Sequence, residues 1–165
     1  MMQSIFDQYG WDNANAIPLT QGLINQTFEV HSVQGDFILQ HINTQVFKDP
    51  FAIDHNIKAI GQYYNTNQPD QLFTFLVPNI VGETLMEWDG KYYRAFKKID
   101  GIALDVLITA SQAKAAANQF GQFTASLIEF PIAQLKVTIP QFHDLALRYH
   151  QFEQAVHWLH QRYVH

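Results

Sequence analysis

Hydrophobic and polar residues alternate over several short stretches in the first hundred residues, a pattern that indicates strands. Residues 27–33 and 37–42 both approximate this alternation, and the turn between them is expected to centre on Gln34-Gly35-Asp36. Strand character also begins at Pro18, and the polar segment 21–26 that follows is typical of a turn. The pattern therefore predicts three consecutive antiparallel strands joined by tight connections.

A short helix is predicted over residues 6–11, and a longer helix is predicted after the third strand. Apolar side chains recur at helical spacing between Phe51 and Tyr64. Asp49 suits the N-cap of this helix, and Pro50 suits its first position, where a backbone N–H has no partner within the helix. We therefore expect one helix that begins at Pro50 and ends near Tyr64.

Asp89-Gly90 is the strongest two-residue hairpin signal in the chain. It lies between residues 84–88 and 91–99, which we expect to form the fourth and fifth strands. The order is then three strands, one helix and two strands. This order describes a five-stranded antiparallel sheet with one helix on its face.

Beyond Asp100-Gly101 the pattern becomes helical, and helices are predicted over 111–128 and 145–163. The first of them carries a stripe that we expect to be buried. Its members are Ala113, Ala117, Phe120, Phe123 and Leu127. We therefore predict an α+β fold, with a first domain over residues 1–101 and a helical segment over residues 102–165.

Composition narrows the classes of partner. With 47% hydrophobic residues, the 165-residue chain can bury a core, so we expect it to fold compactly. The net charge is −5 and no basic block is longer than Lys97-Lys98, which argues against a nucleic-acid partner. The absence of cysteine excludes disulfides and thiolate chemistry. Neither a secretory signal nor a membrane span is predicted, so we expect a soluble cytoplasmic protein that does not bind membranes.

The predicted sheet with one helix has the arrangement of a kinase small lobe, although topology alone is weak support. Residues 22–28 lie between the first two strands, where a kinase places the loop that covers the nucleotide phosphates. Gly22 would let the backbone approach a phosphate closely. A plain hairpin turn is the alternative interpretation of this segment, because it contains a single glycine.

Four segments together resemble the amino-terminal half of the aminoglycoside phosphotransferase and choline kinase superfamily. Within that superfamily they most resemble the N-acetylhexosamine 1-kinase branch of sugar kinases. The segments are residues 22–28, 37–50, 93–101 and 138–144, the last followed by Arg148-Tyr149. The resemblance implies ATP as phosphate donor, magnesium as cofactor, and a sugar or similar hydroxyl compound as acceptor.

The resemblance also implies where the nucleotide contacts lie. The loop residues would cover the phosphates, namely Gly22, Asn25, Gln26 and Thr27. Phe28 and Val30 would face the base from above, and Ile38 would line the same apolar slot. The connector of residues 98–101, at the end of the last predicted strand, would be the hinge. Its backbone groups would pair with the edge of adenine at Lys98, Ile99 and Asp100.

Two departures from the family pattern shape the expected function. The third strand offers Gln40 and His41 where kinases of this superfamily place a basic residue, so Gln40 is the expected phosphate contact. The chain also has no His-Gly-Asp loop, and beyond Asp144 its only acidic residue is Glu153 and it has no asparagine. We therefore expect nucleotide binding without phosphate transfer, as in a truncated gene product, a fragment or one piece of a split protein.

Other interpretations of the same residues are weaker. His150, His157 and His160 could form a metal cluster, but Glu153 is the only nearby carboxylate. Paired carboxylates of glycosidase type are conceivable, but spacing does not force them together. The candidates are Asp100, Asp105, Glu83 and Glu87. Ser111 and Ser126 lack the Gly-x-Ser-x-Gly setting of a nucleophilic serine, so a serine-based active site is unsupported.

The main alternative belongs to another class of protein. A kinase lobe that has lost its chemistry exposes apolar surface, and such surface commonly becomes an interface. The chain would then be a non-catalytic interaction or regulatory protein that forms a homodimer. In the phosphotransferase interpretation, the partner is instead a separate chain that carries the C-terminal lobe.

Overall fold

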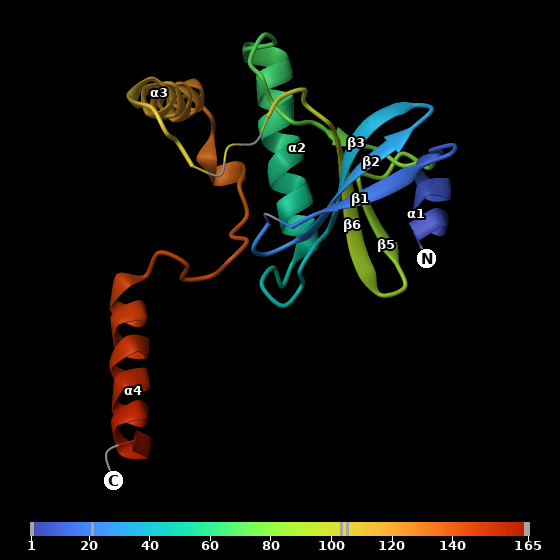
Figure 1. Cartoon of the computed structure of the whole chain (residues 1–165). Coiled ribbons are helices and arrows are strands. Elements are labelled where there is room, and N and C mark those ends of the chain that lie inside the picture. Colours follow the sequence, from blue (N-terminus) through green and yellow to red (C-terminus); the bar gives the residue numbers. More distant parts are fainter. Residues whose placement is uncertain (1, 21, 103, 105, 164–165) are drawn as a thin grey trace.

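The structure is a computed structural model that describes residues 2–20, 22–102, 104 and 106–163. One antiparallel sheet with a helix on either side forms the first part of the chain, and two further helices lie away from the sheet (Figure 1). The elements are α1 (Met2–Tyr9), β1 (Asn15–Leu19), β2 (Gln26–Ser32), β3 (Gly35–His41), α2 (Pro50–Asn67), β4 (Leu76–Val77), β5 (Leu85–Trp88), β6 (Lys91–Lys97), α3 (Ala110–Ser126), a 3-10 turn (Ile132–Gln134) and α4 (Leu145–Tyr163).

The sheet has six strands rather than the five predicted. Its order is β1-β2-β3-β6-β4, and β5 also pairs with β6. The extra strand arises because β4 and β5 pair with successive parts of β6, through Phe96 and Ala95 for β4 and residues 91–94 for β5. Pro78 follows β4 directly and has no N–H to continue the ladder. The α+β class and the antiparallel sheet are confirmed.

The two hairpins follow their turn residues. Asp89 and Gly90 both have positive φ, 52° and 68°, as a type I′ turn requires, and the predicted hairpin is confirmed. The turn between β2 and β3 lies slightly earlier than predicted, at Val33-Gln34. The reason is that Gly35, with φ of 125°, already pairs with Ser32.

Helix α2 begins as its sequence predicts. The side chain of Asp49 accepts a hydrogen bond from the backbone N–H of Ala52 at 3.1 Å, and Pro50 is the first helical residue. The helix continues three residues past the predicted end, to Asn67, whose side chain donates to the carbonyl of Tyr63 at 2.9 Å. This helix covers one face of the sheet.

Helix α1 covers the other face. It ends at Tyr9, two residues before the predicted end, and Trp11 then folds back onto the sheet. The indole of Trp11 stacks between the rings of Tyr9 and Phe37, with both centroid distances at 4.5 Å. The main buried cluster lies here. It contains Ile5, Phe6, Tyr9, Trp11, Val30, Phe37, Leu39, Met86, Tyr93 and Ala95.

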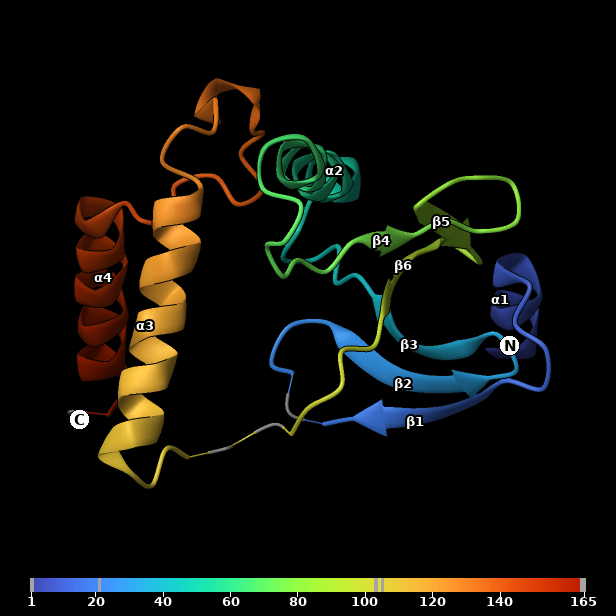
Figure 2. The ribbon, with the colours of Figure 1, turned by 90° about the horizontal axis from the view of Figure 1, so that it is seen from above.

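The helices after residue 102 are packed differently from the prediction. Phe120 is 76% exposed, so the expected burial of the α3 stripe is wrong. The described part of α3 meets α2 at its C-terminal end, where the Tyr64 hydroxyl lies 2.7 Å from Ser126 Oγ and the Gln68 amide donates to the Ser126 carbonyl. Figure 2 shows that the rest of α3 stands away from the sheet. Among the described residues, no helix has the length and apolar character needed to cross a membrane.

Candidate functional site

A cleft of about 570 Å³ lies between strand β3 and the connector that follows β6. This volume is in the range of small-molecule sites. Apolar side chains dominate its walls, and Gln40 and Asp100 add polar groups. Its lining residues are Ile38, Gln40, Thr74, Phe96, Lys97, Lys98, Ile99, Asp100, Gly101 and Ile102. Five of the residues predicted from the sequence meet in this cleft, namely Ile38, Gln40, Lys98, Ile99 and Asp100.

The loop between β1 and β2 forms a second, smaller hollow of about 330 Å³. It brings together the other predicted loop residues. They are Gly22, Asn25, Gln26, Thr27 and Phe28. A Cβ on Gly22 would lie 3.3 Å from the carbonyl oxygen of Asn25, so the loop folds tightly over this glycine. One hydrogen bond links the walls of the two hollows, because the Gln40 amide donates to Thr27 Oγ1 at 3.3 Å.

The predicted positions of Phe28 and Val30 are wrong. Residues directly opposite one another in a ladder share a face of the sheet. Phe28 is opposite Leu39 and Val30 is opposite Phe37, whereas Ile38 is opposite Glu29. Both side chains therefore face α1, and Val30 is completely buried in the core there.

Phe96 takes the place that was predicted for these two residues. It is opposite Ile38 on β6 and lines the cleft beside it. Sequence reasoning missed Phe96 because the pairing of β3 with β6 is not visible in the chain order. Alternation within β6 would have placed it on the same face as Arg94, once one register position was known.

The side chains of the loop are engaged with the end of β3. Asn25 Oδ1 accepts a hydrogen bond from the backbone N–H of Asn43 at 3.0 Å. Gln26 Oε1 lies 3.1 Å from Nδ1 of His41. These contacts hold the side chains of Asn25 and Gln26 against the end of β3.

The connector is fastened to the sheet by Lys98. Its backbone N–H donates to the carbonyl of Asp36 at 3.0 Å, and its Nζ lies 2.5 Å from Oε1 of Glu29. The Lys98 N–H is therefore engaged by the sheet, and the predicted pairing with adenine falls to the other backbone groups of the connector. Within the described residues, the N–H groups of Ile99 and Asp100 make no hydrogen bond to the protein. They remain available at the cleft edge.

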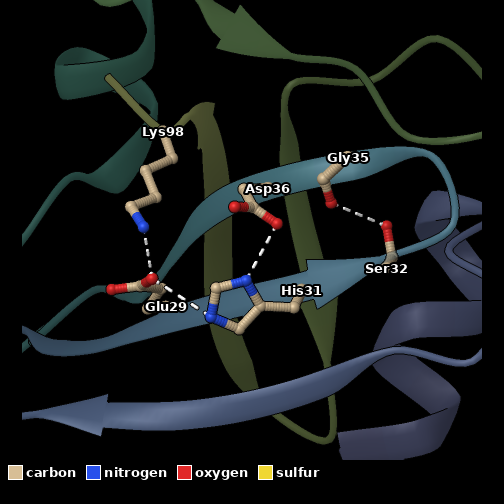
Figure 3. A network of polar contacts seen from close by, with 6 residues as sticks. All are labelled: Glu29, His31, Ser32, Gly35, Asp36 and Lys98. Atoms are coloured by element: carbon tan, nitrogen blue, oxygen red, sulfur yellow. Dashed lines mark hydrogen bonds and ion pairs between the residues drawn. The ribbon is translucent and has the colours of Figure 1, made fainter. Parts of the chain in front are cut away.

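Figure 3 shows that Lys98 belongs to a larger polar network on the cleft face of the sheet. The ring of His31 lies between two carboxylates, with Nδ1 2.8 Å from Asp36 and Nε2 3.1 Å from Glu29. The hydrogen bond to Glu29 is the largest cause that raises the pKa of Lys98, and the charges of Glu29, Asp36 and Asp100 act in the same direction. The ammonium group is thus held by acidic neighbours.

Gln40 and His41 point to opposite faces of β3. Gln40 lines the cleft, whereas the ring of His41 lies 5.3 Å from that of Tyr93 on the side of α1. Burial and, to a smaller degree, the charge of Lys91 lower the pKa of His41. His41 is therefore not placed to contact a ligand in the cleft. Directly opposite Gln40 stands Arg94, which sequence reasoning also missed.

Metal-binding residues do not gather in the described part of the chain. No group of three or more His, Asp and Glu side chains there is arranged to hold a metal ion. His150 and His157 lie instead 2.9 Å from the side-chain amides of Gln154 and Gln161. Asp105, one of the candidate paired carboxylates, lies outside the described residues. The cleft wall contributes one carboxylate, Asp100, so these residues do not by themselves fit a magnesium ion bound to nucleotide.

Comparison with known proteins agrees with this architecture. In fold, the chain is similar to spectinomycin phosphotransferase APH(9)-Ia, solved in complex with ADP and spectinomycin. The TM-score is 0.50 at 12% sequence identity, and the match covers 80% of this chain but 38% of that one. The sheet and its helices thus resemble the kinase-like N-terminal lobe of that protein. Residues 15–165 match the model of the phosphotransferase enzyme family, and the chain belongs to that family.

Proposed function

We propose that this chain is the nucleotide-binding part of an ATP-dependent small-molecule phosphotransferase. The observation that carries the proposal is the cleft between β3 and the connector, which joins apolar walls to free backbone groups. Adenine needs an apolar slot for its faces and backbone donors and acceptors for its edge. Ile38 and Phe96 supply the slot, and Ile99 and Asp100 supply edge groups.

The phosphates would lie toward the end of the cleft marked by Gln40. The Gln40 amide and the Thr27 hydroxyl lie together there, at the base of the loop of residues 22–27. ATP would supply the phosphoryl group that is transferred. Gly22, Asn25, Gln26 and Thr27 would form the cover over the phosphates, as residues of a tight loop whose backbone N–H groups can meet phosphate oxygens.

The division of labour within the chain is also a proposal. Residues 1–101 would form the nucleotide-binding lobe, because the sheet, α2 and the cleft all belong to them. Residues 102–165 would form a helical segment that leads toward a second lobe, or a separate chain, with the catalytic groups. The chain contains no His-Gly-Asp sequence, and the described residues that line the cleft offer no magnesium ligand set. We therefore propose that it binds nucleotide but does not transfer phosphate alone.

For the acceptor, we propose a sugar or amino sugar of the N-acetylhexosamine type. The support is the segment 37–50 together with 138–144, which resemble the N-acetylhexosamine 1-kinase branch. The first of these segments includes β3, the wall of the cleft, so it also supports nucleotide binding.

Calorimetric titration of the purified chain with ADP, ATP and adenosine tests the binding proposal. We expect ADP and ATP to bind with one-to-one stoichiometry. No heat from any adenine compound, together with no thermal stabilisation, would contradict it. A parallel assay of phosphate transfer from ATP with magnesium to N-acetylhexosamines tests the inactivity separately. Turnover that co-purifies with the chain would refute that part alone.

A second candidate function rests on the exposed apolar residues of α3 and α4. Phe120 on α3 and Phe152 and Trp158 on α4 are 76%, 64% and 53% exposed, which is unusual for large apolar side chains. A non-catalytic homodimer would bury them. Analytical ultracentrifugation distinguishes the two functions: a tight dimer that does not respond to nucleotide favours this one.

A further inference from the structure

The polar end of the cleft has a neutral side chain where a cation is expected to meet the inner phosphates. Gln40 occupies that position on β3. On the neighbouring strand β6, Arg94 stands directly opposite and donates its Nε hydrogen to Gln40 Oε1 at 3.0 Å. The nearest cation to this end of the cleft therefore comes from another strand.

The contact with Arg94 fixes which way the Gln40 amide faces. A guanidinium group has donors only, so the amide atom that meets it must be the oxygen. The amide nitrogen then points the other way, where it lies 3.3 Å from Thr27 Oγ1. That nitrogen carries two hydrogens, and Thr27 accepts one of them. The other is left for an acceptor at the phosphate end of the cleft.

Burial lowers the pKa of Arg94, and the charge of Asp54 on α2 acts in the opposite direction, but Arg94 forms no direct ion pair among the described residues. Within the described residues, no carboxylate lies within ion-pair distance of Arg94, and its Nη1 is buried without a hydrogen-bond partner. Its guanidinium carbon lies 5.2 Å from the centre of the Phe96 ring, which lines the cleft. Asp54 makes its direct contacts with other groups, namely Lys58 Nζ at 2.8 Å and the Thr84 hydroxyl.

We propose that Arg94 is a positioning residue for phosphate recognition. It orients the Gln40 amide so that an N–H faces the phosphates, and it places beneath that amide the positive charge that β3 lacks. The pair would do together what a single basic side chain on the third strand does elsewhere. This role rests on the proposed function, because it requires a nucleotide in the cleft.

The test compares the affinities of the full chain for ADP and for adenosine. Wild-type protein is expected to bind ADP more tightly. Arg94→Met should weaken ADP binding by about tenfold, the size of one charge-assisted hydrogen bond, and leave adenosine binding unchanged. Arg94→Lys, which keeps the charge and one donor, should recover part of the loss. Loss of folding would weaken both ligands equally, so the ratio of the two affinities separates positioning from stability.

The matched control is Arg148→Met on α4. Arg148 donates to Gln151 Oε1 at 2.9 Å, a similar contact, but it does not line the cleft. This variant should leave both affinities at the wild-type values. If Arg94→Met does not fold, Gln40→Glu serves instead, because it keeps Arg94 paired and removes the amide donor. It should also weaken ADP selectively.

An unchanged ratio of ADP to adenosine affinity in a folded Arg94→Met or Gln40→Glu protein would overturn the role of Arg94 while leaving the proposed function standing. A wild-type chain that binds neither ligand would overturn both. Equal wild-type affinities for ADP and adenosine would overturn the phosphate contact but not the adenine slot.

Discussion

Lys98 and Glu29 form an ion pair across the cleft face of the sheet, with Nζ 2.5 Å from Oε1 (Figure 3). Lys98 is the first residue after β6, and Glu29 lies on β2, with β3 between the two strands. The pair therefore holds the start of the connector against the sheet, next to the cleft that the connector borders. The position of the adenine-edge groups of Ile99 and Asp100 depends on this attachment.

Removal of this ion pair should loosen the connector. In Lys98→Met, the hydrogen bond from the Lys98 position to the Asp36 carbonyl should open more often, so its amide should exchange with solvent faster. Adenosine binding should weaken as well. Hydrogen exchange followed by mass spectrometry measures the first effect. Lys114→Met on α3 is the control, because Lys114 is exposed and does not line the cleft, and equal exchange in the two variants would contradict the attachment.

Truncation of Val30 should lower stability, whereas truncation of Ile38 should lower nucleotide affinity. Val30→Ala leaves a cavity in the core beneath α1 and should lower the free energy of unfolding by about 2 kcal/mol, without a change in nucleotide affinity. Ile38→Ala removes a wall of the cleft and should weaken ADP binding by roughly tenfold. Urea denaturation and calorimetry measure the two effects. A loss of ADP affinity in Val30→Ala would mean that the faces of β2 are assigned wrongly.

His41 should make stability depend on pH in the mildly acidic range. Its pKa in the folded chain lies below the ordinary value of 6.5, so between these two values the unfolded chain binds more protons than the folded chain. The free energy of unfolding therefore rises with pH across this window. As pH falls through it, protonation of His41 favours the unfolded chain and the protein loses stability. His41→Gln should flatten the slope. Urea titrations from about pH 5 to 8 test this, and an equal slope in both proteins would exclude His41 as the cause.

The N-cap of α2 should contribute to the stability of the whole lobe. Asp49→Ala removes the acceptor for the Ala52 N–H, which should lower the free energy of unfolding by about 1 kcal/mol. Asp49→Ser keeps a side-chain oxygen at the cap and should restore most of it. Thermal and urea unfolding measure the change. If alanine and serine behaved alike, the hydrogen bond to Ala52 would not be what stabilises this end of the helix.

Local signals in the sequence predicted most of the elements. The turn at Asp89-Gly90 and the cap at Asp49 each rest on two or three neighbouring residues, and both are found as predicted. Helix α4 has the predicted bounds, because its helical spacing is also a local signal. The two-residue strand β4 was missed because its pairing with β6 depends on residues almost twenty positions away, and its two residues carry no alternation of their own.

The candidate site was predicted only in part, for a related reason. Alternation shows that Phe28 and Val30 share a face, but it does not show which face lies over the cleft. That choice is made by α1, whose Ile5 and Phe6 pack against Val30 and its neighbours. Arg94 was missed because its pairing with Gln40 joins strands 54 positions apart. The connector was found because its residues are contiguous.

The measurement that tests the account most directly is an amide chemical-shift titration of the labelled chain with ADP. The account predicts that the largest shifts occur at Ile99, Asp100 and Thr27, with the side-chain amide of Gln40 also affected, while α4 remains unchanged. Shifts concentrated instead around Met86 and Tyr93, on the face of the sheet that α1 covers, or no saturable shift at all, would contradict a nucleotide site between β3 and the connector.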